Sequence, residues 1–363
     1  MIVNVIDPAL RLTAGHHLDL GMGVARELRK AGHDVHVYCH AGVTAEAARM
    51  LAAHAAYTPL FKLTPYADAQ SGEDERSGFE RIAGIIADDL RRVRAADAWL
   101  WPSIFSSQAY ACALVNPAAP ICGCVHVEPQ YMSNSGAALW RLALGEAARA
   151  GARIRLGAFE QMLCDQYSPL MPSIPFAKYP IPYDRCRVPA KRDRMTWVGF
   201  FGAQRDEKGV FLLENLIPQL LENGLNIVLH DSSGGSSGSG DARFRTLFGY
   251  VEDLAAEIAN CDLVVTPYNP EPYRTKGSAI VWSALANGVP VVAPRGTASG
   301  TLIEQSGAGT TFGEFSVQSV LAAILAARDD YAALAQHACA FSDRWVAEHG
   351  LQKYVDAMLK ALP

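Results

Sequence analysis

The chain has 363 residues, of which 50% are apolar and 19% charged; this excludes a disordered protein and exceeds the usual size of one core, so two domains are expected. The net charge of −5 argues against a protein that coats nucleic acid, and we expect no nucleic-acid partner. The eight cysteines are scattered, mostly in apolar segments, which is typical of reduced buried thiols and not of a disulfide framework or a metal site.

The first half of the chain alternates short apolar runs with longer amphipathic stretches, which is the pattern of parallel βαβ units. The apolar runs predict strands over 2–7, 34–39, 98–102 and 120–127. The periodic stretches predict helices over 18–31, 45–57, 79–93 and 137–155, and the acidic stretch 64–76 reads as a loop. The chain begins directly with a strand-like run, without a signal or transit segment, so we expect a cytoplasmic protein.

A proline-rich stretch over 168–194 interrupts this alternation and marks a domain boundary. After it, strands are expected over 196–202, 226–231, 244–250, 262–268 and 290–294. Helices are expected over 210–223, 252–259, 278–287, 317–326 and 331–362, and the glycine- and serine-rich run 231–241 reads as a flexible loop. We therefore expect a first domain over 1–178, a linker over 179–190, a second domain over 191–342 and a closing helical segment over 343–363.

Two segments of the first half place polar residues where parallel strands end. Gly15 lies between the first strand and the first helix, and its lack of a side chain lets the backbone approach a ligand. His16 and His17 follow it at the helix start, where they either contact a substrate or are solvated loop residues. His126 ends an apolar strand, and Glu128 follows two residues later. His126 is as compatible with a structural histidine as with a group that orients a sugar hydroxyl.

Two loops of the second half offer cations beside the start of a helix, which is what a nucleotide diphosphate needs. In GFFGAQRDEKG the strand turns at a glycine, and Lys208 precedes the next helix. In PYNPEPYRTKGSAIVWSALANGVPVVAP the loop leads into a helix through Arg274, Lys276, Gly277 and Ser278. Each loop, taken alone, is equally compatible with an ordinary βα connection.

Several of these segments, in this order, resemble the retaining GT-B glycosyltransferases of family 4. The similar segments are GVARELRKAGHDVHVY after Gly15, PICGCVHV ending at His126, YPIPYD, GAQRDEKG, FGYVEDLAAEIANCDLVVTPY and ANGVPVVAP. The resemblance implies an α/β protein of the GT-B type, in which two Rossmann-like domains face each other across a cleft. The paired glutamates of that family fall on Thr275 and Ser283 here, and its arginine falls on Ala203.

The resemblance implies a glycosyltransferase that moves a hexose, with retention, from a nucleotide-diphospho-sugar to a saccharide or lipid-linked acceptor, as in cell-surface polysaccharide or glycan synthesis. His126 would be the catalytic residue, and His16, His17 and Glu128 would bind the acceptor. No cofactor or metal is expected. The donor would be bound by residues of both halves, with Arg205, Arg274 or Lys276 in place of the missing arginine: Gly15, Arg205, Lys208, Arg274, Thr275, Lys276, Gly277, Ser278 and Ser283.

Two alternatives stay open. A nucleotide-sugar 2-epimerase shares the architecture but needs acid/base carboxylates, of which the readable motifs offer mainly Glu128 and Glu304. A non-catalytic nucleotide-sugar-binding protein would fit the loss of the paired glutamates. The stretch LWRLALGEAARAGARIRL, with Arg141, Arg149, Arg153 and Arg155, also suggests possible peripheral contact with an anionic membrane, although an ordinary surface helix explains it as well.

Overall fold

The computed structural model of the chain describes residues 1–13, 15–66, 73–131, 133–170, 174, 176–189, 193–231 and 241–362. The chain forms two compact units, one made of 1–182 with 351–363 and the other of 183–350. The segment expected to close the chain, 343–363, is therefore divided between the two units at Gly350. Most of the expected loop 231–241 and part of the loop 64–76 lie outside the described residues.

The first unit is built on a parallel sheet of seven strands in the order β3-β2-β1-β4-β5-β6-β7. The residues of β1 beyond Ile2, and all those of β4 and β5, are buried, as expected for strands covered on both faces. The strands are β1 (Ile2–Asp7), β2 (Asp34–His40), β3 (Ala56–Phe61), β4 (Ala98–Trp101), β5 (Ile121–Val125), β6 (Ile154–Ala158) and β7 (Phe176–Lys178).

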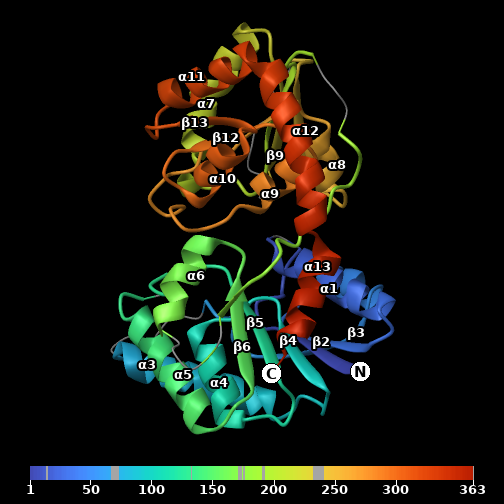
Figure 1. Cartoon of the computed structure of the whole chain (residues 1–363), viewed down its shortest axis with the longest axis vertical. Helices are drawn as coiled ribbons and strands as arrows, with labels where there is room; N and C mark the ends of the chain where they lie inside the picture. Colours follow the sequence, from blue (N-terminus) through green and yellow to red (C-terminus); the bar gives the residue numbers. More distant parts are fainter. Residues whose placement is uncertain are drawn as a thin grey trace. The chain divides into compact units, whose positions relative to one another are not determined.

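The helices of the first unit follow these strands and cover the sheet. They are α1 (His17–Lys30), α2 (Ala45–Ala52), α3 (Glu75–Leu90), α4 (Ser106–Val115), α5 (Gly136–Arg149), α6 (Gln161–Tyr167) and α13 (Leu351–Lys360), with a 3₁₀ turn at Ser168–Leu170. Figure 1 shows α3, α4 and α5 grouped together, and α13, from the end of the chain, beside α1. A Cβ at Gly23 of α1 would lie 2.6 Å from Cδ2 of Leu351, so the Leu351 side chain would have to shift to admit one.

The second unit repeats the same plan with a parallel sheet of six strands in the order β10-β9-β8-β11-β12-β13. Its strands are β8 (Trp197–Phe200), β9 (Asn226–Asp231), β10 (Phe244–Phe248), β11 (Leu263–Val265), β12 (Val291–Pro294) and β13 (Gly309–Phe312). Its helices are α7 (Val210–Glu222), α8 (Leu254–Ala259), α9 (Ala279–Ala286), α10 (Ala298–Ser306), α11 (Val317–Asp329) and α12 (Tyr331–Glu348), with a 3₁₀ turn at Asp206–Lys208.

In each sheet the strand order reverses at one point, between β1 and β4 in the first unit and between β8 and β11 in the second. Loops that leave such a point run in opposite directions, so a crevice opens beyond the carboxyl ends of the two strands. Ligands of open parallel sheets bind there. The fold thus directs attention to the segments that follow Asp7, Trp101, Phe200 and Val265.

Three predicted helices are too long, and glycine explains two of the errors. The helix expected over 137–155 ends at Arg149, because Gly151 adopts φ +65°; Arg153 and Arg155 are therefore outside it. The helix expected over 331–362 is broken at Gly350, with φ +114°, into α12 and α13. The helix expected over 45–57 ends at Ala52, and the β3 segment that follows pairs with β2.

Several elements have no counterpart in the sequence prediction, namely β3, α4, β6, α6, β7, α10 and β13. The stretch 106–115 is apolar on nearly every side and so lacks the amphipathic period that reveals a surface helix. Helix α10 lies in a stretch of small residues, and its start is fixed by Thr297, whose hydroxyl accepts from the Gly300 amide at 3.0 Å.

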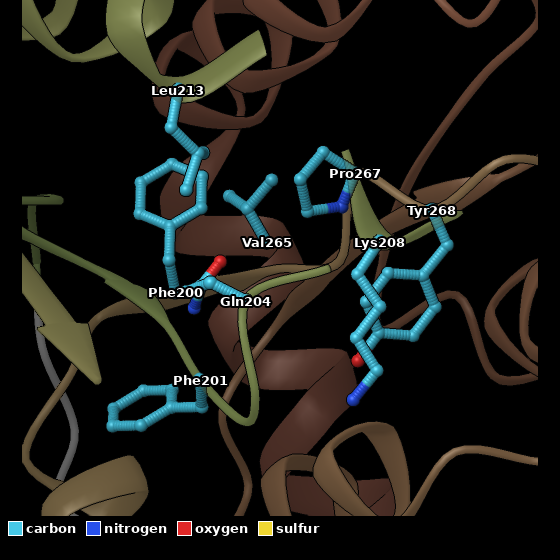
Figure 2. Close-up of a pocket in the computed structure, with 8 residues that line it drawn as sticks. All are labelled: Phe200, Phe201, Gln204, Lys208, Leu213, Val265, Pro267 and Tyr268. Carbon is cyan, nitrogen blue, oxygen red and sulfur yellow. The ribbon is translucent and has the colours of Figure 1, made fainter. Parts of the chain in front are cut away.

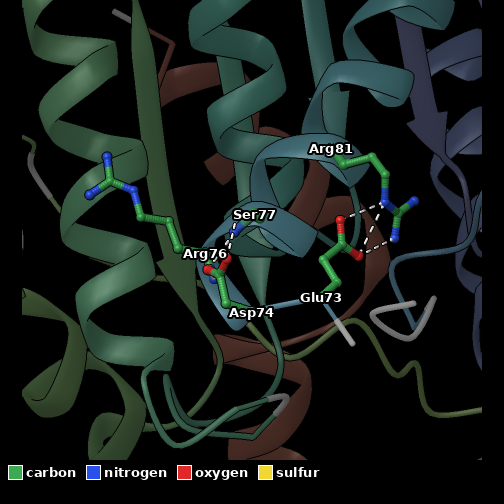
Figure 3. A network of polar contacts seen from close by, with 5 residues as sticks. All are labelled: Glu73, Asp74, Arg76, Ser77 and Arg81. Carbon is green, nitrogen blue, oxygen red and sulfur yellow. Dashed lines mark hydrogen bonds and ion pairs between the residues drawn. The ribbon is translucent and has the colours of Figure 1, made fainter. Parts of the chain in front are cut away.

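Helix α3 begins four residues before the predicted boundary because its first turn is capped. The Asp74 carboxylate accepts the backbone N–H groups of Arg76 and Ser77 at 3.1 and 3.0 Å, and the Ser77 hydroxyl at 2.6 Å. Beside it, Arg81 binds the Glu73 carboxylate through two nitrogens, at 2.9 and 3.0 Å for the shorter contacts (Figure 3). Over the described ranges, the structure contains no helix with the length and hydropathy needed to cross a membrane.

Candidate functional site

The crevice of the first unit contains a histidine hydrogen-bonded to a buried carboxylate. Asp7, the last residue of β1, is 1% exposed, and its Oδ2 lies 2.9 Å from Nδ1 of His17 in the first turn of α1. The other ring nitrogen, Nε2, lies 3.2 Å from the hydroxyl of Tyr66. Because a carboxylate accepts, Nδ1 carries a proton, and in the neutral ring Nε2 holds the free lone pair.

His16 and His126 complete a cluster of histidine rings. The ring of His16 stacks on that of His17, with centroids 4.2 Å apart, and lies 5.2 Å from the ring of His126. His126 Nε2 donates to the Pro102 carbonyl at 2.6 Å, directly beyond β4, and its ring packs edge-on against Phe159 at 5.1 Å. Residues that follow the neighbouring strands β1, β4 and β5 therefore meet at one point.

The three rings differ in pKa, and so in how readily each takes up a proton. Burial lowers the pKa of His126 to about 4 and that of His16 well below its ordinary value, and the neighbouring histidines lower both further. Burial also lowers the pKa of His17, but the charge of Asp7 and the hydrogen bond to it outweigh this and raise the pKa above its usual value. His17 is thus the ring best able to take a proton, whereas His126 stays neutral.

The remaining predicted residues of this unit lie around the cluster. Gly15 adopts φ +93°, a conformation that favours glycine, and no atom lies within 4 Å of the position that a Cβ would take. Glu128 lies two residues beyond His126, and together with burial its charge raises the pKa of Tyr167. The Nε2 atom of His16 is buried without a hydrogen-bond partner, a condition that a bound polar group would relieve.

The crevice of the second unit contains a lysine in an apolar setting. Burial, followed by the charge of Arg205, lowers the pKa of Lys208 to about 8. Its ammonium lies 5.5 Å from the centre of the Tyr268 ring, and Figure 2 shows the lysine chain running alongside that ring. Gly202, with φ +100°, brings the turn after β8 close to the lysine: a Cβ there would lie 3.2 Å from Nζ.

The loop that carries Gly202 is held in place by two side chains. The Gly202 amide donates to Nδ1 of His230 at 3.3 Å, and Nε2 of His230 donates to the Gly249 carbonyl at 2.9 Å. Gln204 donates to the carbonyls of Gly202 and His230 at 3.2 and 2.7 Å. A small cavity of about 10 Å³, enough for about one water molecule, lies among the residues drawn in Figure 2. The turn is therefore rigid before any ligand binds.

Two tyrosines bring the predicted cations together. The rings of Tyr268 and Tyr273 lie 4.4 Å apart, and the Lys276 ammonium lies 5.7 Å from the centre of the Tyr273 ring. Burial raises the pKa of Tyr268 to about 12, although a hydrogen bond with Ser278 and the charge of Arg205 act to lower it. Lys208, Arg205 and Ser278 thus share Tyr268 as a neighbour, and they place two cations in the crevice beyond β8 and β11, one of them paired with Glu207 at 3.0 Å.

Other predicted donor residues lie in different surroundings. Ser278 is the N-cap of α9, where its hydroxyl accepts from the Val281 amide at 3.4 Å, and Gly277 directly precedes it. Arg274 is exposed and pairs with Glu271 at 3.1 Å. Thr275 and Ser283 are 4% and 5% exposed; Ser283 lies inside α9, where its carbonyl accepts the Asn287 side chain at 2.8 Å.

Sequence reasoning missed Asp7, Tyr66, Tyr268 and Tyr273 in these crevices, and Glu160, which lies beyond β6. Asp7 ends the predicted strand 2–7, and this position is the signal that could have found it. Burial raises the pKa of Glu160 to about 8, and its Oε1 is buried without a partner, although the charge of Lys178 lowers the pKa. The two tyrosines of the second unit follow prolines in the repeated PY of PYNPEPY.

Within the described residues, no group of three or more histidine, cysteine, aspartate or glutamate side chains is arranged to hold a metal ion. Burial raises the pKa of Cys39 and Cys122 to about 12, so these two thiols stay protonated and are poor nucleophiles at neutral pH.

No family model matches the chain, and a search of curated proteins finds no match either. Solved structures do match along the whole length. The glycotransferase of kitacinnamycin shares 17% identity and a TM-score of 0.68, covering 100% of this chain and 99% of that one. HepE from Anabaena, in complex with UDP-glucose, shares 14% identity and a TM-score of 0.70, with coverage of 99% and 98%.

Sucrose-phosphate synthase from Thermosynechococcus elongatus gives the same TM-score of 0.70 at 12% identity, with coverage of 99% and 98%. The fold is that of the GT-B glycosyltransferases. The expectation of two parallel Rossmann-like sheets is confirmed. At these identities the likeness establishes the fold, and the chemistry must be argued from the crevices themselves.

Proposed function

We propose that this chain is a glycosyltransferase that moves a sugar from a nucleotide-diphospho-sugar to a hydroxyl of an acceptor. The observation that carries the proposal is the His17–Asp7 pair, a base of fixed tautomer at the ligand-binding edge of the first unit. Two features support it: the charged crevice around Lys208 in the second unit, and the UDP-glucose complex of the similarly folded HepE.

In the proposed reaction the first unit holds the acceptor and the second holds the donor. His17 Nε2 takes the proton of the acceptor hydroxyl as its oxygen bonds to the anomeric carbon. The bond from that carbon to the diphosphate oxygen breaks, and the diphosphate leaves with the electron pair. Lys208 and the amides at the start of α9 stabilise its charge.

His126 has a different role in this scheme. Its Nε2 is committed to the Pro102 carbonyl, so Nδ1 is the acceptor of the neutral ring. With a pKa of about 4 it is a poor base near neutral pH, but it can accept a hydrogen bond from a sugar hydroxyl. We retain His126 as a residue that touches substrate, and we assign proton transfer to His17.

The stereochemical outcome separates two versions of this proposal. The family 4 resemblance implies retention of the anomeric configuration. The His17–Asp7 pair supports inversion, because a single displacement needs a base at the acceptor hydroxyl. The anomeric proton coupling in the NMR spectrum of the product distinguishes the two directly.

For the substrates, we propose a hexose donated from a nucleotide diphosphate such as the UDP-glucose that HepE binds. We propose a saccharide or lipid-linked acceptor and a role in cell-surface polysaccharide or glycan synthesis, as the sequence resemblance implies, and we propose that the reaction takes place in the cytoplasm. Neither a metal nor a cofactor enters the scheme, since the cations are side chains.

The test is incubation of the purified protein with a panel of UDP- and dTDP-sugars, followed by NMR with and without sugar or phenolic acceptors. Release of the nucleoside diphosphate, with wild type but not with His17→Gln, supports the transferase. Conversion of the donor sugar into its C2 epimer without acceptor would instead identify an epimerase. Saturable nucleotide binding with neither product would identify a binding protein.

A further inference from the structure

Tyr66 lies against the nitrogen that the proposed mechanism uses. Its hydroxyl is 3.2 Å from His17 Nε2, and its ring meets those of His17 and Phe105 edge-on, with centroids 6.1 and 5.3 Å apart. The His17 side chain is only 11% exposed, whereas Tyr66 is 41% exposed. Tyr66 therefore covers the base and is itself reached by solvent.

The hydrogen bond between these groups has a defined direction. His17 Nδ1 donates to Asp7, so Nε2 of the neutral ring accepts, and the Tyr66 hydroxyl donates. Burial, then the charges of Asp7 and Tyr131, raise the pKa of Tyr66, so its hydroxyl keeps its proton at neutral pH. A hydroxyl that donates to Nε2 is also what an acceptor substrate must present before it loses its proton.

We propose that the Tyr66 phenol occupies the acceptor-hydroxyl position on His17 when no acceptor is bound, and that an acceptor binds by displacing it. This rests on the proposed function in taking His17 as the base. The side chain that fills the position is a ring with one hydroxyl, packed edge-on against the buried Phe105. The ligand that replaces it is accordingly a hydroxyl carried on a ring, either a phenol or a sugar.

The fold allows this displacement. Tyr66 lies in a turn beyond β3, outside the strand ladder, so its side chain can move without breaking strand pairing. Asp7 and Phe105, by contrast, are 1% and 7% exposed and stay in place. The acceptor-hydroxyl position on His17 is therefore formed by the buried residues Asp7 and Phe105 and filled by the exposed side chain of Tyr66.

The first test does not depend on turnover. In Tyr66→Ala the position is vacated, and p-cresol or methyl glucoside at millimolar concentration should bind and shift the imidazole ¹⁵N resonances of His17. The same probes should leave the wild-type resonances unchanged, and they should not bind to Tyr131→Ala, a matched removal of a tyrosine of equal exposure. Binding of p-cresol alone indicates a phenolic acceptor, and of methyl glucoside alone a sugar acceptor. If neither shifts His17 in folded Tyr66→Ala, the proposal is wrong.

The second test uses turnover and the variant Tyr66→Phe, which keeps the ring packed on Phe105. This variant loses the hydrogen bond from the Tyr66 hydroxyl to His17 Nε2, with which the acceptor must compete. The KM for the acceptor should therefore fall about 2- to 10-fold, and kcat should stay within about twofold of the wild-type value. A fall of kcat by 10²-fold or more would show that Tyr66 relays the proton, and would overturn the displacement. A third outcome is that wild-type protein transfers no sugar at all while p-cresol still binds to Tyr66→Ala. That result would contradict the proposed function but would still support the proposal that the Tyr66 phenol fills a ligand position on His17.

Discussion

The two crevices lie at the same topological point of similar sheets, yet they carry opposite chemistry. Beyond β1 and β4 the first unit gathers three imidazoles, one buried carboxylate and a tyrosine hydroxyl. Beyond β8 and β11 the second gathers ammonium and guanidinium groups around two tyrosines. The first set suits proton transfer from a neutral hydroxyl, and the second suits a phosphate anion. A shared fold thus provides a place for a site, and its loops determine which site it becomes.

Burial lowers the pKa of basic groups in both crevices, but the consequence differs between the histidines of the first unit and Lys208 of the second. In the first unit burial keeps His16 and His126 neutral, and Asp7 selects His17 as the ring that accepts a proton. In the second unit burial lowers the pKa of Lys208 to about 8, which leaves it charged at neutral pH and poorly hydrated. A poorly hydrated cation loses less on binding an anion, so the same physical effect favours both chemistries.

The largest effect is expected from His17. His17→Gln should lower kcat/KM by a factor on the order of 10²–10⁴, because the base is removed, while nucleotide affinity measured by calorimetry should not change. His126→Gln should lower kcat/KM less, since that ring has a pKa of about 4 and only holds a hydroxyl. The opposite ranking of the two variants would make His126 the catalytic base. Asp7→Asn should resemble His17→Gln, because the tautomer would no longer be fixed.

Wild-type activity should also increase with pH over the range in which His17 loses its proton. The base works when neutral, so kcat/KM should rise as the pH increases through the raised pKa of His17. A pH–rate profile whose lower limb lies near pH 4 would point to His126 instead.

The next largest effect is expected from Lys208. Lys208→Ala should weaken binding of the nucleotide-sugar by about 1.5–3 kcal/mol if the lysine makes a charge-assisted hydrogen bond. Arg205→Ala is the matched control and should cost less, since Arg205 is exposed and already paired with Glu207 at 3.0 Å. Wild-type affinity should decline above pH 8 as the free lysine loses its proton. Equal losses in both variants, by calorimetry, would contradict the assignment.

A smaller effect concerns stability in acid. The folded chain binds a proton on His126 only near pH 4, while the unfolded chain does so near pH 6.5, so stability should fall as the pH drops between these values. His126→Gln should flatten that fall, as measured by urea unfolding at pH 7 and pH 5. His17 acts with the opposite sign: its raised pKa adds stability that is present below pH 6.5 and lost as the pH rises. An unchanged slope in His126→Gln would show that other groups dominate.

The smallest effect is expected at a membrane. Trp140 and Leu144 of α5 are buried in the core, and Leu139 and Leu142 are half-buried against it, so mainly charge remains for a bilayer. Arg141 and Arg149 face solvent, and Arg149 pairs with Glu146. We expect weak binding to anionic vesicles at low salt that 0.15 M salt removes, and further loss in Arg141→Ala/Arg149→Ala. Absence of binding at low salt would exclude this contact.

Much of the fold could be predicted because local sequence reports burial. Strands such as 98–102 and 120–127 are short continuous apolar runs, and helices such as 210–223 carry the apolar period of an amphipathic helix. The positions of His17, His126 and Lys208 at strand or helix ends followed from the same patterns. The α4 segment was missed because it lacks an amphipathic period, and β3 and β6 were missed because each begins inside a stretch predicted as the end of a helix.

The sequence by itself determined two parallel α/β units and the loops at which their ligands should bind. It did not determine which polar side chains meet there. His17 contacts Asp7, which lies ten residues earlier in the chain, and Tyr66, which lies 49 residues later. The Lys208 ammonium lies beside the ring of Tyr268, which follows a different strand. Tertiary structure also assigned α13 to the first unit, beside α1. The physical reason is that a periodic pattern encodes which face of an element is buried, whereas contacts between elements depend on strand order and register, which only the folded sheet fixes.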